Sequence, residues 1–151
     1  MKHLKIGDPA PDFSVNNQNN STIELNTFNG KKLVIYFYPK DNTPGCTTQA
    51  CNLRDNYNHF IKNGFEIIGV SADSVAKHEK FIEKYHLPFD LLADEEKIMI
   101  NDYGVWGMKK FMGKEYNGIH RMTFVLDENH IITQIIEKVK TKIHSDQILN
   151  V

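Results

Sequence analysis

Two continuous runs of apolar residues stand out in the first half of the chain. LVIYFY spans residues 33–38 and FEIIGV spans residues 65–70. Continuous rather than alternating apolar residues are typical of strands that are covered on both faces of a sheet. The connection between the runs is long enough to hold a helix. The pattern therefore predicts a right-handed strand–helix–strand unit with a parallel pair of strands.

The segment between these strands has the periodicity of an amphipathic helix. At about 100° per residue, with Cys46 as the reference, five apolar positions fall within about 60° of it; they are Ala50, Leu53, Tyr57, Phe60 and Ile61. Thr43 is a favoured N-cap residue, and proline, here Pro44, is tolerated at the first helical position. The pattern therefore predicts a helix that begins at Pro44 and turns Cys46 toward the sheet.

Weaker patterns predict the remaining elements. The polar stretch 16–22 separates two short apolar runs and is typical of a hairpin loop. Asn117-Gly118 predicts a second hairpin turn, which would place Arg121 on the strand that follows. The other expected elements are a helix over 74–86 with Val75, Phe81, Ile82 and Tyr85 facing inward, a loop and short strand over 87–94, a short helix over 95–104 that ends at Gly104, and a last strand over 130–139.

The order of these elements predicts an α/β protein with a thioredoxin-like fold. We expect a central mixed β-sheet flanked by helices, with an N-terminal β-hairpin, in a single domain that spans residues 1–151. Open α/β sheets place their ligands at the carboxyl ends of the strands. The first strand-to-helix junction, which holds Cys46, is therefore the expected reactive position.

Composition excludes several classes of function. The net charge is −1 and the basic residues are dispersed, so we expect no nucleic-acid partner. No segment has the apolar length of a signal peptide or a membrane span, so we expect a cytoplasmic protein with no membrane contact. In a reducing cytosol, two cysteines are more often catalytic or redox-active than a permanent cross-link.

Metal and cofactor sites are not expected either. With only two cysteines, a closed zinc site would need at least two histidines, and the seven histidines show no closely spaced pair. No glycine-rich phosphate loop follows a strand. We therefore predict no metal, flavin or nucleotide cofactor.

The spacing of the cysteines indicates what they do. Cys46 falls in the first turn of the predicted helix, where free backbone N–H groups and the helix dipole favour a thiolate. In an intact helix the Cα atoms of Cys46 and Cys51 would lie about 8.6 Å apart, beyond the reach of an ordinary disulfide. The spacing suits a nucleophile and a second thiol that meet only after oxidation to sulfenic acid and local unwinding.

The residues around Cys46 resemble the peroxiredoxins, and most closely their Q-type subgroup. The signature Pro-x-x-x-Thr-x-x-Cys is present as Pro39, Thr43 and Cys46, and the subgroup's second cysteine is Cys51. Four further stretches match the subgroup: GDPAPDF, FYPKDNTPGCTTQACNLRD, YGVWGMKKFMGKEYNGIHR and TFVLDE.

This resemblance implies a thioredoxin fold and the reduction of hydrogen peroxide and organic hydroperoxides. It implies that Cys46 is the peroxidatic cysteine, that Cys51 resolves its sulfenic acid, and that thioredoxin or a similar dithiol returns the electrons. The implied catalytic set is completed by Thr43, Arg121 and Pro39, and the implied substrate contacts are Thr43, Gly45, Cys46 and Arg121. Many peroxiredoxins have Glu at the position that Gln49 occupies in this chain. Gln49 is therefore a candidate for a residue that orients the groups of the Cys46 pocket. The subgroup is often monomeric, so we expect a monomer.

Other interpretations of these residues stay open at the level of sequence. The same fold could serve a thiol–disulfide oxidoreductase, although the usual Cys-x-x-Cys motif is absent, or a non-enzymatic redox sensor. Arg121 could be a surface arginine and Cys51 a spare thiol. His78, on the apolar face of its helix, is better explained as a core-edge histidine than as a catalytic group, and Trp106 as a packing residue than as part of the pocket mouth.

Overall fold

A five-stranded sheet forms the centre of the molecule. The computed structural model describes residues 3–149. The strand order is β5-β4-β3-β8-β9. Strands β3 (Lys32–Phe37), β4 (Phe65–Ser71) and β5 (Asp90–Ala93) run parallel, whereas β8 (Met122–Leu126) and β9 (Ile132–Ile136) pair antiparallel. The mixed sheet and the parallel first pair of strands agree with the sequence prediction.

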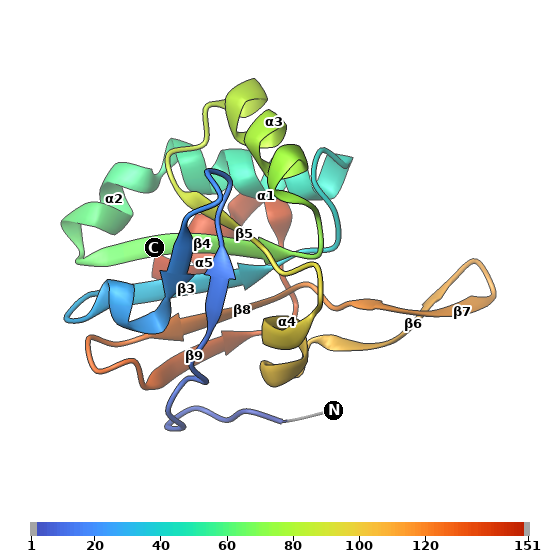
Figure 1. The fold of residues 1–151 in the computed structure, drawn as a ribbon. Coiled ribbons are helices and arrows are strands. Elements are labelled where there is room, and N and C mark those ends of the chain that lie inside the picture. The colour runs from blue at the N-terminus through green and yellow to red at the C-terminus, as the bar shows by residue number, and fades with distance from the viewer. Residues whose placement is uncertain (1–2, 150–151) are drawn as a thin grey trace.

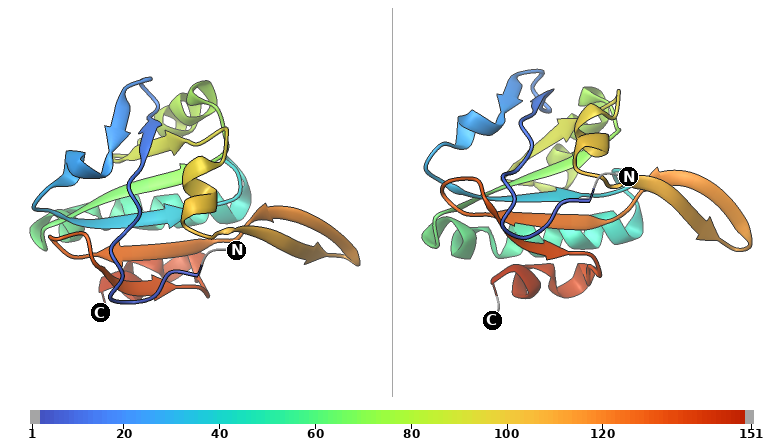
Figure 2. Two further views of the ribbon diagram at one scale, coloured as in Figure 1. Left: turned by 60° about the horizontal axis from the view of Figure 1, so that its bottom comes forward. Right: turned by 90° about the horizontal axis from the view of Figure 1, so that it is seen from below.

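Helices and a hairpin cover the two faces of this sheet (Figures 1 and 2). One face carries α1 (Pro44–Asp55), α2 (Tyr57–Lys62), α3 (Val75–Tyr85) and α5 (His144–Leu149), which follows the short η2 (Thr141–Ile143). The other face carries the N-terminal hairpin of β1 (Ser14–Asn16) and β2 (Thr22–Glu24), then η1 (Leu25–Phe28) and α4 (Ile98–Asp102). These elements confirm the thioredoxin-like plan with an N-terminal hairpin.

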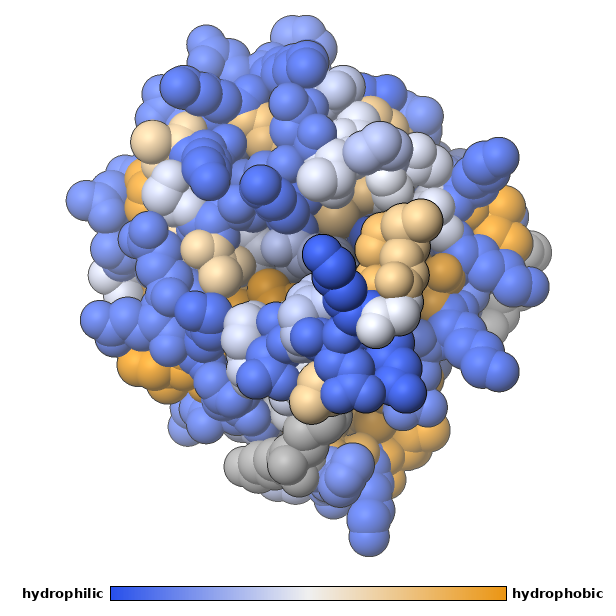
Figure 3. Space-filling model, turned by 90° about the vertical axis from the view of Figure 1, so that its right-hand side faces the viewer, coloured by the Kyte–Doolittle hydropathy of each residue, from blue (hydrophilic) through white to orange (hydrophobic). Residues whose placement is uncertain are grey.

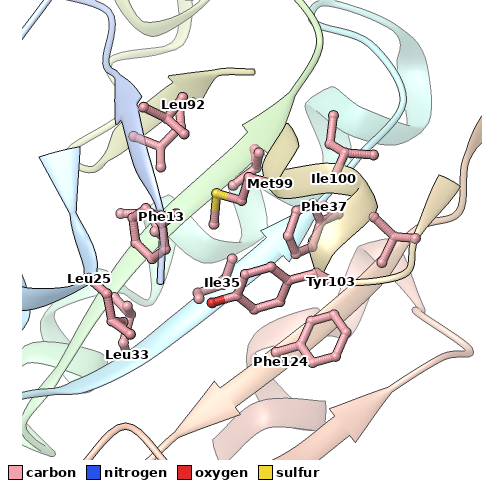
Figure 4. Packing of buried hydrophobic residues seen from close by; sticks show 14 of the residues in the cluster. Phe13, Leu25, Leu33, Ile35, Phe37, Leu92, Met99, Ile100, Tyr103 and Phe124 are labelled. Carbon is pink, nitrogen blue, oxygen red and sulfur yellow. The ribbon is translucent and has the colours of Figure 1, made fainter. Parts of the chain in front are cut away.

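The alternation of side chains along β3 supplies both cores. Leu33, Ile35 and Phe37 point into the cluster under the N-terminal hairpin and α4 (Figure 4). Tyr36 and Tyr38 point to the other face, where Cys46 also lies. A strand buried on both sides must be apolar at every position, which explains the continuous run that marked it in the sequence.

The predicted helix between β3 and β4 is two helices. Helix α1 ends at Asp55 and α2 begins at Tyr57, with Asn56 at φ −109° and ψ 9° between them. The break changes the phase of the helical period. Phe60 stays fully buried, but Ile61 is 46% exposed, so its predicted place on the inner face is wrong.

The second hairpin is displaced from its predicted position. Strands β6 (Trp106–Phe111) and β7 (Lys114–Ile119) pair antiparallel and project from the body (Figure 1). Their turn is Met112-Gly113, with φ of 51° and 80°, as a two-residue turn of this kind requires. Asn117 pairs with Met108 inside the ladder. The Asn-Gly signal was therefore misleading, because Gly113 offers the same backbone freedom at the position that the strand register selects.

Candidate active site

The loop between β3 and α1 places Cys46 at the start of a helix. Thr43 is the N-cap with extended backbone, Pro44 follows as the first helical residue, and Cys46 lies two positions further on. The Thr43 hydroxyl does not cap the helix; it donates a hydrogen bond to the Lys40 carbonyl at 2.9 Å. The first turn also contains no acidic side chain. Neither a capping side chain nor a carboxylate therefore competes with the Cys46 sulfur for the positive end of the helix dipole.

Arg121 meets Cys46 at this helix terminus. Its Nη2 donates to the Cys46 Sγ at 3.3 Å, and its Nη1 donates to the Gln49 Oε1 at 2.6 Å. The sulfur is sheltered, since Cys46 is only 2% exposed. A guanidinium at this distance stabilises negative charge on the sulfur, and the exclusion of water strengthens that interaction. The structure thus brings together two of the predicted site residues, with Gln49 as the contact that orients the arginine.

Gly45 leaves room for the guanidinium. A Cβ atom at this position would lie 3.3 Å from the Arg121 Nη2, closer than most side-chain contacts. A larger residue would push against the arginine that faces the sulfur. Gln49 is fully buried, and its Nε2 has no hydrogen-bond partner in the described structure, which leaves one donor free within the site.

Strand pairing explains how Arg121 reaches a helix 75 residues earlier in the chain. Strand β8 runs antiparallel to β3 and pairs Met122 with Phe37. The residue before Met122 therefore lies at the carboxyl end of β3, where the loop to α1 begins. Arg121 itself sits between β7 and β8, so its predicted position within a strand is wrong. The His120 N–H, which donates to the Val105 carbonyl at 2.7 Å, fixes this connection.

Lys109 is a second cation near the sulfur that sequence reasoning missed. Its Nζ donates to the Ile119 carbonyl at 2.9 Å across the β6–β7 hairpin. Burial lowers the pKa of Lys109, the positive charge of Arg121 lowers it further, and the negative charge of Cys46 opposes this. No local pattern in the sequence marks this lysine, because only the hairpin register brings it to the site.

Cys51 lies on the same helix but on a different side. It is partly exposed, and both cysteines are free thiols. With α1 intact from Pro44 to Asp55, ideal helix geometry keeps the two Cα atoms about 8.6 Å apart. That separation exceeds the span of an ordinary disulfide. The folded helix thus holds the thiols apart, as predicted from their spacing.

A buried polar network holds the loop of residues 39–43, in which Pro39 is half-buried. Asp41 accepts a hydrogen bond from the Tyr38 hydroxyl at 2.5 Å and lies 2.6 Å from the His78 Nδ1. The His78 Nε2 donates to the Leu92 carbonyl at 2.9 Å. Both ring nitrogens are used and the ring is fully buried, which agrees with the interpretation of His78 as a structural histidine. Asp41 was missed in the sequence, since a buried loop carboxylate leaves no periodic signal.

This network is also the described group that comes nearest to a metal site. Asp41, Asp73 and His78 could offer ligand atoms within 4.8 Å of one another. Their atoms are already engaged, however, since Asp73 Oδ2 accepts from both the Asp41 N–H and the Ser71 hydroxyl. Lysines line the adjoining cavity and oppose a divalent cation. The cluster is better explained as a device that fixes the loop.

Trp106 packs rather than lining the mouth of the site. Its ring lies against the cluster under α4, and the Lys97 Nζ sits 5.3 Å from the ring centroid. This contact agrees with the packing interpretation of the sequence.

Helices within residues 3–149 are too short and too polar for any of them to cross a bilayer.

The sequence is similar to a known protein family and to two named proteins over most of its length. The family model described as the AhpC/TSA family matches residues 6–135. Peroxiredoxin Bcp of Escherichia coli (strain K12) is 45% identical over 150 residues, which cover 99% of this chain and 96% of that protein. Peroxiredoxin Bcp of Bacillus subtilis (strain 168) is 46% identical over 146 residues, which cover 97% of this chain and 93% of that protein.

Solved structures show the same fold. The PrxQ of Xylella fastidiosa superposes with a TM-score of 0.92 at 30% identity, covering 99% of this chain and 96% of that one. The bacterioferritin comigratory protein of Xanthomonas campestris superposes with a TM-score of 0.86 at 36% identity, covering 91% of this chain and 88% of that one. The similarity therefore spans nearly the whole chain, including α1, which carries both cysteines, and the loop that precedes it.

Proposed function

This chain belongs to the AhpC/TSA family as a peroxiredoxin of the Bcp/PrxQ type, and we propose that it reduces peroxides with Cys46 as nucleophile and Cys51 as resolving thiol. It is a thiol peroxidase with two cysteines. The observation that carries the proposed roles is the contact of 3.3 Å between the Arg121 guanidinium and the Cys46 sulfur at a helix N-terminus.

In the first step, the Cys46 thiolate attacks one oxygen of the peroxide. The S–O bond forms as the O–O bond breaks, the departing oxygen takes a proton and leaves as water or an alcohol, and Cys46 becomes a sulfenic acid. Negative charge moves from sulfur to the departing oxygen. The Arg121 guanidinium faces the sulfur, so it stabilises both the thiolate and the developing charge.

Neighbouring groups hold the peroxide and the arginine. The Gln49 Oε1 fixes the guanidinium at 2.6 Å. Thr43 has already donated its hydroxyl hydrogen to the Lys40 carbonyl, so its oxygen is free to accept the O–H of a hydroperoxide. The backbone around Gly45 gives close access to the sulfur, and Pro39 shields one side of it from water. Hydrogen peroxide and organic hydroperoxides both present the group that these contacts recognise.

In the second step, the Cys51 thiol attacks the sulfenic sulfur. An S–S bond forms and water leaves, so the protein holds an intramolecular disulfide. This step requires the first turns of α1 to unwind, because the intact helix keeps the two sulfurs apart. An external dithiol such as thioredoxin then reduces the disulfide and restores both thiols. The Xanthomonas campestris homologue has alkyl peroxide reduction activity, which supports organic hydroperoxides as substrates of this chain.

Two cysteine variants test this scheme. Cys46→Ser should abolish peroxide consumption, because no other thiol is activated. Cys51→Ser should still consume one equivalent of peroxide in a stopped-flow burst, and intact mass should then show one added oxygen, but thioredoxin-linked cycling should stop. Full turnover by the Cys46→Ser protein would refute the assignment of the nucleophile.

A further inference from the structure

A cavity of about 250 Å³ opens beside the loop that precedes α1. Lys40 and Asn42 from that loop form one wall, and α3 forms the other through Lys77, Lys80 and Lys84. Figure 3 shows that this side of the molecule is mainly hydrophilic at the height of α3. We call this feature the lysine cavity. Its position next to the reactive loop suggests a role that the peroxide chemistry does not use.

The four lysines of the cavity outnumber the two carboxylates that line it. All four are exposed, and within residues 3–149 none of them forms an ion pair with a carboxylate. The three lysines of α3 follow a spacing of three and four residues, which gathers them on one flank of the helix. Glu79 and Glu83 fall on the other flank at about 100° per residue. Such a gathering of like charges is tolerated because it is exposed, and it attracts a negatively charged partner.

The lysine cavity lies on the side of α1 that carries Cys51. Arg54 is three positions after Cys51, so their side chains share a helix face. The Arg54 Nη1 donates to the Tyr85 carbonyl at the end of α3 at 2.7 Å. The Tyr85 hydroxyl and the Lys84 Nζ both donate to the Asn42 Oδ1, at 3.2 Å and 3.4 Å. This chain of contacts joins the Cys51 face to the rim of the cavity.

We propose that the lysine cavity and its rim dock an acidic dithiol protein that reduces the Cys46–Cys51 disulfide. The inference rests on the proposed function, because it concerns the partner of the second half of that cycle. The peroxide is small and uncharged, so its approach gains no electrostatic steering from the four lysines. The reductant must instead reach a disulfide that forms on the Cys51 face, beside these lysines.

The floor of the cavity favours a protein surface over a small anion. Asp41 and Asp73 line the cavity, and each is only 8% exposed. Their carboxylates repel an anion that enters deeply, whereas the lysines at the rim can meet acidic side chains spread over a partner's surface. Rim charges of this kind mainly raise the rate of association, and the effect falls with ionic strength.

The test measures the reduction of the preformed disulfide by stopped flow. The variant is Lys77→Glu combined with Lys80→Glu. The probes are a reduced thioredoxin of acidic isoelectric point and dithiothreitol, an uncharged small dithiol. The second-order rate constant with thioredoxin should fall at least about tenfold at low salt and lose most of its salt dependence. The rate with dithiothreitol and the peroxide burst should stay unchanged.

The matched control is Lys31→Glu combined with Lys62→Glu. These lysines are exposed, and they lie at the opposite end of β3, near the contact of Lys32 with Gly64. Equal losses in both double variants would show an effect of net charge alone and would overturn the docking site, as would no loss in either.

Saturable binding of inorganic phosphate, with thioredoxin reduction unaffected by the variant, would assign the cavity to a small anion instead. A wild-type protein that shows the peroxide burst but is not reduced by thioredoxin would overturn the docking proposal alone. The absence of the burst would overturn the proposed function itself.

Discussion

At the scale of single residues, the contact between Arg121 and Cys46 depends on the shape of the guanidinium. Arg121 bonds Gln49 with one nitrogen and the sulfur with another. Lysine keeps the charge but cannot make both contacts in this geometry. Arg121→Lys should therefore lower the second-order rate constant for peroxide by at least about 100-fold. The control is Arg54→Lys, which should leave the peroxide burst unchanged. Equal rates for wild type and Arg121→Lys would show that charge alone suffices.

Two neighbouring tyrosines offer a matched test of buried hydroxyls. Tyr36 and Tyr38 are each 1% exposed, and their rings stack at 5.3 Å. The Tyr38 hydroxyl donates to Asp41, whereas the Tyr36 hydroxyl has no hydrogen-bond partner among residues 3–149. Tyr38→Phe should lower the free energy of unfolding by about 1–3 kcal/mol, and Tyr36→Phe should be neutral or stabilising. Urea denaturation compares them, and equal losses would contradict the assigned hydrogen bonds.

His144 gives the fold a defined pH dependence. Burial lowers its pKa from 6.5 to about 4, and the charge of Arg121 adds to this, while the hydrogen bond with Gln147 opposes it. The unfolded chain binds a proton below pH 6.5 that the folded chain excludes. The free energy of unfolding should therefore fall as the pH drops from 6.5 to about 4, by up to about 1.4 kcal/mol per pH unit.

The measurement is urea denaturation at several pH values with a histidine variant. His144→Gln should remove this part of the slope, whereas His59→Gln, at an exposed position, should keep it. NMR titration should show His144 neutral at pH 6. A titration midpoint near 6.5 for His144 would refute the role of burial.

At the scale of elements, the proposed cycle requires α1 to do two things in turn. Its first turn, held by the bond from the Thr47 N–H to the Thr43 carbonyl at 2.8 Å, presents the sulfur to peroxide. The same turn must open before the two cysteines can join. Oxidation should therefore reduce the hydrogen-exchange protection of residues 47–50, while β4 stays protected. Undiminished protection of these amides in the disulfide form would contradict local unwinding.

The elements also show where sequence patterns carry information. Strands β3 and β4 were predicted because burial on both faces forces an apolar run, and the start of α1 was predicted because Thr43 and Pro44 mark a helix terminus. The hairpin turn and the break at Asn56 were not, because each is decided by strand register or by packing. Equally, Lys109 and Asp41 reach the site only through tertiary structure.

At the scale of the whole molecule, the two halves of the site come from distant parts of the chain. Sequence reasoning predicted Cys46, Cys51, Thr43 and Arg121 as site residues through a motif and a resemblance, but the arginine's contact with the sulfur depends on the pairing of β8 with β3. The monomeric state stays a prediction. The projecting hairpin exposes Phe111 and Met112 at its tip, so sedimentation at high protein concentration is the direct measurement. A monomer is expected, and a stable dimer would contradict it.

The central claim is that an activated sulfur at a helix terminus reacts first with peroxide and is then joined by its neighbour. The most direct measurement is stopped-flow mixing of the reduced protein with hydrogen peroxide, followed by intact mass. We predict a second-order rate constant far above that of free cysteine and the loss of two hydrogen atoms per chain. A rate no faster than free cysteine, or a mass that shows no disulfide after one equivalent of peroxide, would contradict the account.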